Sequence, residues 1–327
     1  PVDTATFQYD ANGTRTASTR DLAGTISRTY GSASTHNCLL GFTQAATAGG
    51  STANTSVSYQ YNSAGDLLGD GLTSYRYDSE GRLESASTGQ GEDAPTTKYA
   101  HNALGQRVFK TEPLYSSSTQ SSTSNSNKTG KNLNNLLADD DEPQEPQPGL
   151  IQQILSFVSK LWSPSTSDAE KLGFSYMYAE DGSLLGEYGS GGTNSSGTAQ
   201  YIYLPTASGP MPIAAVIKGQ TYAVHSDHLN TPRKLTQADG QTAWQWAYSA
   251  FGDEQPTTGA KRFTNETTNP TTGATSIPEV TFNLRYPGQY FDKETKLHYN
   301  YFRSYRPADG TYTQGDPIGL AGGVESV

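Results

Sequence analysis

The 327-residue sequence contains little charge, few hydrophobic residues and a single cysteine. Hydrophobic residues make up 33% of the chain and charged residues 17%, so much of its polarity comes from uncharged side chains. The lone Cys38 excludes an internal disulfide framework and a cysteine-based zinc site. No apolar run approaches the about 18 residues that a membrane-spanning helix requires, so we expect no membrane span.

The sequence also lacks features that mark several common functional classes. Its net charge of -10 argues against nucleic-acid binding, which needs a basic surface. It has no Gly-x-Ser-x-Gly motif of the kind that carries the nucleophile of many hydrolases. Its first residues have neither Met nor the charged and apolar regions of a signal peptide, so we expect a soluble fragment or processed product.

Glycine and tyrosine, by contrast, are abundant, at 34 and 21 residues, and favour short strands joined by turns. Five stretches share one pattern. Two aromatic positions are separated by one residue, Asp or Asn follows directly or within a few positions, and a glycine comes shortly after. They are FQYDANGTR from Phe7, YQYNSAGDLL from Tyr59, YRYDSEGRL from Tyr75, YAHNALGQRV from Tyr99 and YMYAEDGSLL from Tyr176. Tyr-x-Tyr puts both rings on one strand face, and the turn residues reverse the chain. Each unit is predicted to be a β-hairpin that pairs with the next one.

Residues 115–170 interrupt these repeats with a different composition. The segment begins with a Ser/Thr/Asn-rich run and continues through the acidic, proline-bearing ADDDEPQEPQPG, so we expect an insertion that buries almost nothing. Apolar residues at helical spacing then predict a short amphipathic helix over 149–162. The helix either docks on the sheet, or acts as a plug or contacts another protein or a membrane, and it is too short to span a bilayer.

His225, Asp227 and His228 form an H-x-D-H motif that would suit a divalent metal ion by residue type. In a strand, positions 225 and 227 share a face while 228 points away, and no fourth ligand lies nearby in the sequence. We therefore predict a hydrogen-bonded turn that fixes the strand starting near Arg233, with no bound metal and no cofactor.

Two longer segments and the five repeats together resemble the Rhs or YD-repeat proteins, which carry polymorphic toxins. The segments are YAVHSDHLNTPRKLTQADGQTAWQWAYSAFGD, over 222–253, and NLRYPGQYFDKETKLHYNYFRSYRPADGTYTQGDPIGLAGG, over 283–323. The resemblance covers about residues 5–112 and 172–323. It implies an all-β fold in which antiparallel YD-repeat hairpins form a spiralling sheet, part of a hollow cocoon-like shell.

The resemblance also implies how the chain is organised and what it does. It predicts YD-repeat sheet over 1–114 and 171–282, a self-cleaving block over 283–320, and the start of a toxin region at 321–327. The expected partners are the chain's own enclosed toxin, the remaining repeats of a longer core, a secretion-apparatus component and an immunity protein. Such a protein is made in the bacterial cytoplasm and then secreted or delivered into a target cell.

Peptide hydrolysis by carboxylates needs two of them close enough to share a proton. By resemblance to the D-P-x-G-L motif, with Pro317 and Gly319 as its other fixed residues, Asp316 is the catalytic aspartate of an aspartic-type autoprotease. The bond that it cuts is then Leu320–Ala321. Arg303 matches a family arginine near the site, where a guanidinium holds a carboxylate ionised or clamps the scissile carbonyl.

The sequence offers three candidates for the second carboxylate. Asp292 matches the family's upstream acidic position, with Glu294 and Asp309 as further candidates. The chain departs from the family pattern twice here: Lys296 stands where the family has glycine, and Arg306-Pro307 where it has Asp-Pro. Lys296 is therefore expected to disturb a turn or to add a cation beside the carboxylates.

Two alternatives stay open at this point. Asp316-Pro317 with a glycine soon after also makes good turn chemistry without any cleavage. A non-catalytic YD-repeat cell-surface, adhesive or carbohydrate-binding protein would share the repeats but would not require the Asp292, Arg303 and Asp316 set.

Overall fold

The computed structural model describes residues 4–21, 24–33, 38–89, 91, 93–115, 168–247, 249–258 and 279–317. The predicted helix over 149–162 and the Leu320–Ala321 bond, with Gly319, lie outside these residues. Within the described ranges no helix is long and apolar enough to cross a membrane. The one helical element described is a single turn of 3-10 helix, η1 (Asp168–Lys171).

The described chain folds into three antiparallel sheets. The first sheet contains β1 (Thr4–Tyr9), β2 (Arg15–Asp21), β3 (Thr25–Ser32), β4 (Leu39–Ala48) and β5 (Ser51–Ser58). The second contains β6 (Gln60–Tyr61), β7 (Leu67–Gly69), β8 (Thr73–Tyr77), β9 (Leu83–Thr88), β10 (Thr96–His101), β11 (Arg107–Thr111), β12 (Gly173–Tyr178), β13 (Leu184–Gly189), β14 (Thr198–Thr206), β15 (Gly209–Ile217), β16 (Gln220–Ser226), β17 (Pro232–Thr236), β18 (Thr242–Gln245) and β19 (Thr257–Thr258). The third contains β20 (Tyr290–Phe291), β21 (His298–Asn300), β22 (Arg303–Arg306) and β23 (Thr311–Tyr312).

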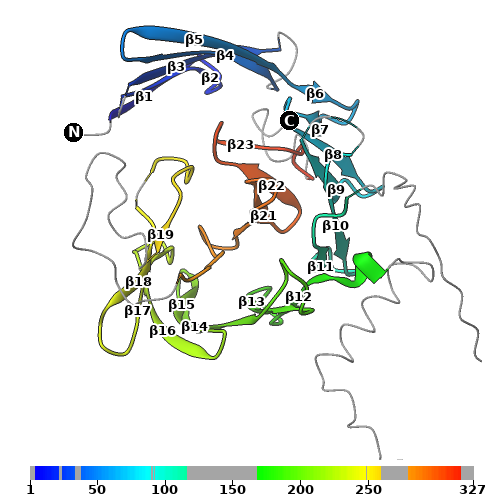
Figure 1. The fold of residues 1–327 in the computed structure, drawn as a ribbon, viewed down its shortest axis with the longest axis vertical. Helices are drawn as coiled ribbons and strands as arrows, with labels where there is room; N and C mark the ends of the chain where they lie inside the picture. Colours follow the sequence, from blue (N-terminus) through cyan, green and yellow to red (C-terminus); the bar gives the residue numbers. More distant parts are fainter. Residues whose placement is uncertain are drawn as a thin grey trace, which may run out of the picture.

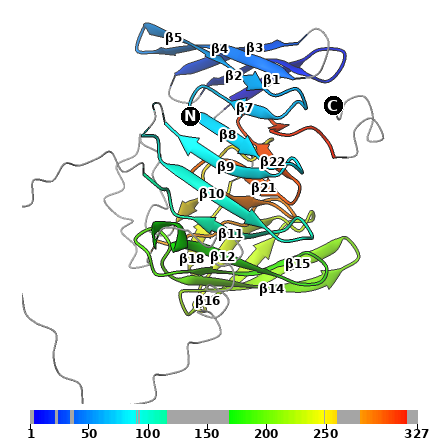
Figure 2. The same cartoon turned by 90° about the vertical axis from the view of Figure 1, so that its right-hand side faces the viewer.

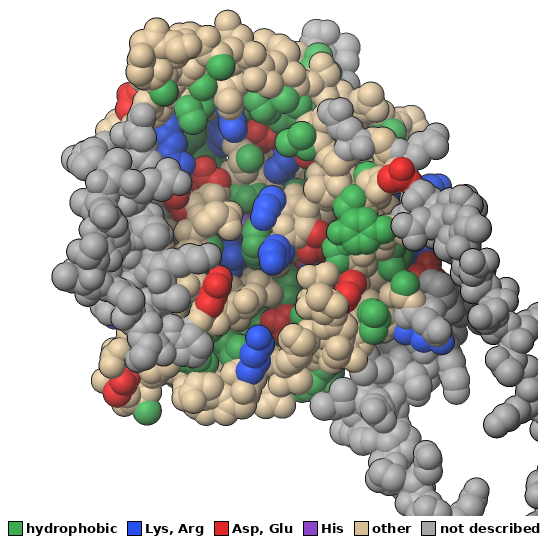
Figure 3. Space-filling view, viewed as in Figure 1, with side chains coloured by type: hydrophobic (Ala, Val, Ile, Leu, Met, Phe, Trp, Pro, Cys, Tyr) green, Lys and Arg blue, Asp and Glu red, His purple; other side chains and the backbone are tan. Residues whose placement is uncertain are grey.

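Each strand of the first two sheets pairs with the strand that follows it in sequence, apart from the break between β5 and β6. Figure 1 shows that this meander curls on itself, from β1–β5 through β6–β11 to β12–β19, and Figure 2 shows β7–β12 stacked in order below β1–β5. The third sheet lies inside the curl (Figure 1). Side chains, several of them Lys and Arg, fill the centre of this face in Figure 3. The prediction of a nearly all-β chain of long antiparallel sheets is confirmed.

The five predicted repeats form the hairpins β1–β2, β6–β7, β8–β9, β10–β11 and β12–β13. In the β8–β9 turn, Asp78 Oδ1 accepts hydrogen bonds from the backbone N–H groups of Glu80 (2.9 Å) and Arg82 (3.0 Å). Gly81 takes a φ of 75°, which a side chain would strain. The Asp/Asn and the glycine of the pattern therefore shape the turn, as the sequence predicts.

The second tyrosine of the Tyr-x-Tyr pattern links one hairpin to an earlier strand. Tyr61 donates its hydroxyl to the Leu39 carbonyl (2.7 Å), Tyr77 to that of Leu67 (2.9 Å), Tyr178 to that of Arg107 (2.9 Å) and Tyr203 to that of Leu184 (3.0 Å). We call these four bonds the tyrosine ladder. Because the acceptors are backbone carbonyls, the ladder fixes the register of successive repeats without a side-chain partner.

Two apolar cores lie between the curled sheet and the residues after 279. One joins β12–β18, including Trp244 and Trp246, to Phe282 and Tyr290. The other joins β3–β10 to Leu297. Residues 283–317, which we call the C-terminal block, therefore supply apolar side chains to both cores and hold the curl from inside.

The first hairpin meets the segment after β18, which closes the curl. Phe7 packs edge-on against Phe251, with ring centroids 4.9 Å apart. The Arg15 guanidinium lies 4.0 Å from the Phe251 ring centroid, and Arg20 forms an ion pair with Glu254. Residues more than 230 positions apart in sequence are thus joined by aromatic, cation–π and ionic contacts.

The H-x-D-H segment forms the predicted hydrogen-bonded turn. Asp227 Oδ1 accepts from the backbone N–H groups of Leu229 (2.9 Å) and Thr231 (3.0 Å), and Oδ2 accepts from Arg233 Nε (2.9 Å). These hydrogen bonds lower the pKa of Asp227 despite its partial burial. Asp227 therefore acts as the turn residue of one more hairpin, β16–β17.

Candidate functional site

The four acidic residues singled out from the sequence are spread along the C-terminal block. Asp292 and Glu294 lie in the turn between β20 and β21, Asp309 lies in the loop between β22 and β23, and Asp316 follows β23. Figure 1 places the block against the inner face of β6–β13. Each acidic side chain can therefore be described by what it contacts on that face.

Asp292 is completely buried, and two cations from β11 hold its carboxylate. Arg107 Nη1 lies 2.6 Å from Oδ2, and Lys110 Nζ lies 3.1 Å from Oδ1. Burial alone would raise the pKa of Asp292, but the two cations outweigh it and the pKa is lowered. Asp292 is thus held ionised in the interior.

Lys110 also brings Glu294 to the same place. Its Nζ lies 3.2 Å from Glu294 Oε2, and the Tyr99 hydroxyl donates to Oε1 of the same carboxylate (3.0 Å). β20 ends at Phe291, so the chain reaches Glu294 through a turn and not along a strand. Among the described acids of the block, Asp292 and Glu294 are the two that share a cation.

Arg107 lies between the repeats and the block. Its guanidinium carbon is 4.3–5.3 Å from the ring centroids of four tyrosines: Tyr99, Tyr176, Tyr290 and Tyr299. Its backbone N–H donates to the Tyr299 hydroxyl (2.9 Å). The aromatic faces and the Asp292 carboxylate together compensate for burying this cation.

Asp309 is buried beside the residue that departs from the family pattern. Arg306 Nε lies 2.7 Å from Asp309 Oδ2, and the Tyr59 hydroxyl donates to the same oxygen (2.8 Å). The Arg306 guanidinium also lies 4.2 Å from the Tyr59 ring centroid. Arg306 therefore neutralises Asp309, and both side chains hold this loop against Tyr59, the residue before β6.

Lys296, the other departure, adopts a φ of 62°. This left-handed conformation is the one that glycine takes at no steric cost, so the turn is kept with a less suitable residue. Its ammonium lies 5.8 Å from the Phe291 ring centroid, whereas the cations on Asp292 and Glu294 come from Arg107 and Lys110.

Asp316 differs from the other acids because it lies at a cavity. Arg303 Nη1 is 3.1 Å from Asp316 Oδ2, and the Arg303 guanidinium stacks 3.9 Å from the Tyr312 ring centroid. Both side chains keep some solvent access, at 24% for Arg303 and 16% for Asp316. The structure thus pairs Arg303 with Asp316, and it pairs Asp292 with residues of β11 instead.

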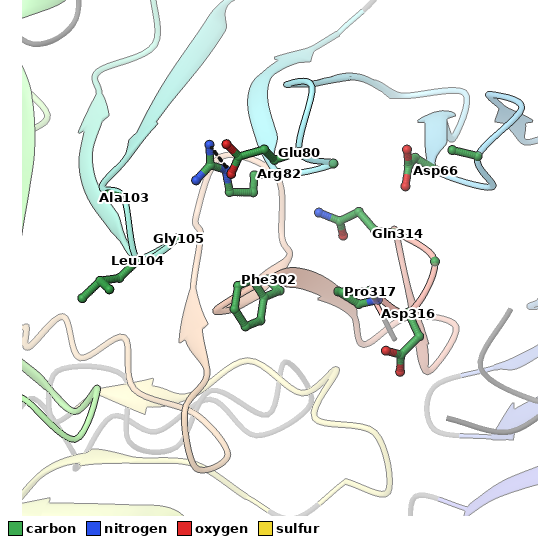
Figure 4. Close-up of a pocket in the computed structure, with 13 residues that line it drawn as sticks. Asp66, Glu80, Arg82, Ala103, Leu104, Gly105, Phe302, Gln314, Asp316 and Pro317 are labelled. Atoms are coloured by element: carbon green, nitrogen blue, oxygen red, sulfur yellow. Dashed lines mark ion pairs between the residues drawn. The ribbon is translucent and has the colours of Figure 1, made fainter. Parts of the chain in front are cut away.

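The cavity has a volume of about 570 Å³ and lies between three repeat turns and the end of the block (Figure 4). Its lining includes Asp66, Glu80 and Arg82 from the turns, and Phe302, Gln314, Asp316 and Pro317 from the block. Asp292 is not among the residues that line it. In the part of the chain that the structure describes, no group of acidic, histidine or cysteine side chains has the arrangement of a metal site.

Several curated bacterial proteins match parts of the chain. Double-stranded DNA deaminase toxin A of Burkholderia cenocepacia is 31% identical over 145 residues, which is 39% of this chain and 9% of that protein. Toxin protein Tse5 of Pseudomonas aeruginosa is 36% identical over 104 residues, which is 30% of this chain and 6% of that protein. Probable deoxyribonuclease RhsB of Dickeya dadantii is 36% identical over 104 residues, or 32% of this chain and 6% of that protein.

This chain belongs to the Rhs/YD-repeat toxin family. The Rhs chain spans less than a tenth of the length of these three relatives. No protein-family model matches it. Among solved structures, the Photorhabdus luminescens Tc holotoxin pore, in a form with the mutation TccC3-D651A, matches 98% of the Rhs chain and 14% of the other chain, at 12% identity and a TM-score of 0.51. That similarity shows a shared fold.

Sequence reasoning missed Arg107 and Lys110, which decide the environment of Asp292. One signal was present in the repeats of this Rhs chain. Two residues after the turn glycine, three of the five hairpins have leucine, at Leu67, Leu83 and Leu184, whereas the other two have arginine, at Arg15 and Arg107. A cation at a position that is otherwise apolar and buried predicts a compensating partner opposite it, which is the Asp292 carboxylate for Arg107 and the Phe251 ring with the Ala308 carbonyl for Arg15.

Proposed function

We propose that this chain is a section of an Rhs shell that encloses a C-terminal toxin and releases it by cutting its own Leu320–Ala321 bond. The observation that carries the proposal is the Asp316–Arg303 pair at the cavity, four residues before that bond. The curl of β1–β19 around the C-terminal block supports the enclosing role, because it gives the chain a concave inner face. The remaining repeats, a secretion-apparatus component and an immunity protein are partners by family resemblance.

In this proposal Asp316 and Arg303 divide the chemistry. The Asp316 carboxylate takes a proton from a water molecule, whose oxygen adds to the Leu320 carbonyl carbon. The guanidinium of Arg303 stabilises the negative charge that develops on the carbonyl oxygen. Asp316 then returns the proton to the Ala321 nitrogen as the peptide bond breaks, so no proton is gained or lost overall.

The second carboxylate of the family mechanism is proposed to have a different role here. Asp292 is buried, ionised and held by two cations, which suits a base or an anchor better than a proton donor. Glu294 and Asp309 are likewise occupied, by Lys110 with Tyr99 and by Arg306 with Tyr59. We infer that these three acids fix the block to the shell, so that Asp316 is presented at the cavity.

The same anchoring favours one other function, a shell section that does not cut itself. All three buried acids have structural partners, and a non-catalytic YD-repeat protein would need nothing more from them. A shell section that does not cut itself would leave a C-terminal fusion protein intact, whereas a self-cleaving one would release the fused domain. One experiment therefore separates the two functions.

The test is expression of the chain with a reporter domain fused after Val327. Cleavage of the parent into two fragments, with the released fragment beginning at Ala321 by mass spectrometry, is the expected result. Asp316→Asn should leave the fusion full-length, and Arg303→Ala should slow cleavage by about 10²-fold or more. Asp181→Asn, at an exposed turn aspartate, is the matched control and should cleave like the parent.

Several outcomes of this experiment count against the proposal. A parent that stays full-length on a denaturing gel removes the autoprotease and leaves the structural shell. A released fragment with another first residue moves the scissile bond. Cleavage by folded Asp292→Asn supports the anchoring role of Asp292, whereas its loss in a folded variant returns Asp292 to the reaction.

A further inference from the structure

The Arg303–Asp316 ion pair is partly open to water, so the pair alone fixes its geometry poorly. The Arg303 side chain is 24% exposed and that of Asp316 is 16% exposed. Water competes for such pairs, and a long arginine side chain has many rotamers to lose. A displacement of about 1 Å in a reacting group can slow a reaction by about 10²-fold. Self-cleavage through Arg303 therefore needs further contacts that hold its guanidinium in place.

Tyr312 contacts this guanidinium through its ring. The Arg303 guanidinium carbon is 3.9 Å from the Tyr312 ring centroid, closer than Arg107 lies to any of its four tyrosines. Arg303 and Tyr305 share one face of β22, and Tyr312 on β23 is paired directly with Tyr305. Tyr312 is thus a diagonal cross-strand neighbour of Arg303, a position from which long side chains meet.

The Tyr312 ring is itself held by two neighbours. Asn300 Nδ2 donates to its hydroxyl (2.8 Å), and the Tyr305 ring packs edge-on against it, with 5.6 Å between centroids. The Tyr305 hydroxyl donates in turn to the Phe251 carbonyl (3.1 Å). The support of the ring therefore comes from the segment after β18 as well as from the C-terminal block.

The backbone that carries Asp316 is fixed to the strand that carries Arg303. Gln314 Oε1 accepts from the Ser304 N–H (2.8 Å), and the Thr313 N–H donates to the Ser304 carbonyl (2.8 Å). Ser304 directly follows Arg303, and Gln314 is two residues before Asp316. These bonds set the distance between the two backbones, and the Tyr312 ring then limits where the longer of the two side chains can go.

We propose that Tyr312 is a positioning residue, which holds the Arg303 guanidinium beside Asp316 and thereby raises the rate of self-cleavage. The inference rests on the proposed function, because Tyr312 acts through Arg303. The ring needs no hydroxyl for this role, since a cation is attracted to the aromatic face. A ring that only packed against its neighbours would change folding stability and would leave the cleavage rate of the folded protein unchanged.

The cleavage rate of the reporter fusion tests the role of the ring. Tyr312→Leu should slow cleavage at least about fivefold, as expected for loss of one partly exposed cation–π contact. Tyr312→Phe keeps the aromatic face and should cleave within about twofold of the parent rate. In an Arg303→Ala background, Tyr312→Leu should change the rate by less than about twofold, because the two residues act as a unit. Tyr9→Leu, which removes a tyrosine that is 49% exposed on β1, is the matched control and should cleave like the parent.

An NMR signal reports the same contact without any cleavage. A proton over an aromatic ring is shielded, so the Arg303 Nε–H signal should move downfield in Tyr312→Leu and keep its position in Tyr312→Phe. The signal is identified by its loss in Arg303→Lys. A signal that Tyr312→Leu leaves in place overturns the proposal. Should Tyr312→Leu fail to unfold cooperatively, Tyr312→Thr replaces it, since β-branched residues suit a strand.

The outcomes separate the positioning role from the proposed function. A parent that cleaves no faster than Tyr312→Leu overturns the positioning role alone, and so does equal slowing by Tyr312→Leu in the parent and in Arg303→Ala. A parent fusion that stays full-length overturns the proposed function and the positioning role together. Slowing by Tyr312→Leu that Tyr312→Phe does not share, and that Arg303→Ala abolishes, supports both.

Discussion

At one end of the C-terminal block, Asp292 is fully buried and has a cation beside each carboxylate oxygen. At the other end, Asp316 forms an ion pair with the partly exposed Arg303 at a cavity. At the buried end, breaking any of these ion pairs would leave an uncompensated charge in the interior. The cavity end can exchange one partner for another at little cost. A single block thus combines a buried carboxylate held by two cations with a partly exposed ion pair at a cavity.

The largest difference between the two ends should appear on removing each charge. Asp292→Asn leaves Arg107 and Lys110 buried without their counter-charge and should lower the free energy of unfolding by about 3–5 kcal/mol. Asp316→Asn should lower it by less than about 1 kcal/mol. Urea unfolding at pH 7.5 measures both. Similar losses for the two variants would show that the ends are not distinct.

The second largest effect is a loss of folding stability in acid, caused by a buried histidine next to Asp292. Burial and nearby Arg285 lower the pKa of His298 to about 3, and this histidine packs on Phe291 beside Asp292. Below its usual pKa of about 6.5 the unfolded chain binds a proton that the folded chain refuses, so stability falls as pH drops from 6.5 toward 3. The contribution is about 2 kcal/mol between pH 7.5 and pH 5.0.

Urea midpoints at the two pH values, for the parent and for His298→Gln, measure this effect. The loss on acidification should be smaller in His298→Gln by about that 2 kcal/mol. His101, whose pKa burial and Arg107 lower to about 4, should account for a further part of the loss in both proteins. An identical pH dependence in parent and variant would remove His298 as a cause.

The smallest effect concerns two non-glycine residues with left-handed backbone, one near each end. Lys296→Gly should raise the free energy of unfolding by about 1 kcal/mol, since φ is 62° there and the side chain is exposed, with its ammonium 5.8 Å from the Phe291 ring centroid. Tyr301→Gly, at a φ of 59°, also loses the bond from its hydroxyl to the Leu104 carbonyl, so its gain should vanish. Thermal or urea unfolding compares them, with Lys296→Ala as the variant that should not gain.

The repeats could be predicted from the sequence because their determinants are local. The spacing of Tyr75, Tyr77, Asp78 and Gly81 within seven residues is sufficient to predict a hairpin, and the structure forms it. The arrangement of the block could not be predicted in this way. Asp292 and Arg107 are 185 residues apart, and only the replacement of an expected leucine by Arg107 hinted at their contact.

The site was predictable to the same limited degree. The motif around Asp316 singled out one carboxylate as a candidate, and the structure places Arg303 Nη1 3.1 Å from it. Gln314 was not singled out, because what distinguishes it is that its Oε1 accepts from the Ser304 N–H of β22 as well as from the hydroxyl of its neighbour Thr313. Contacts of that kind depend on how the hairpin and the loop pack, which the order of residues alone does not show.

The tyrosine ladder has a consequence for how such chains change over evolutionary time. A hydroxyl that donates to a backbone carbonyl does not depend on the side chain of the accepting residue. The Tyr178 hydroxyl therefore donates to the Arg107 carbonyl in the same way as the Tyr77 hydroxyl donates to the Leu67 carbonyl. A repeat can then be duplicated, lost or exchanged without a matching change in its neighbour. Hairpin repeats joined in this way can replace one another, and the size of the sheet follows from the number of repeats in the chain.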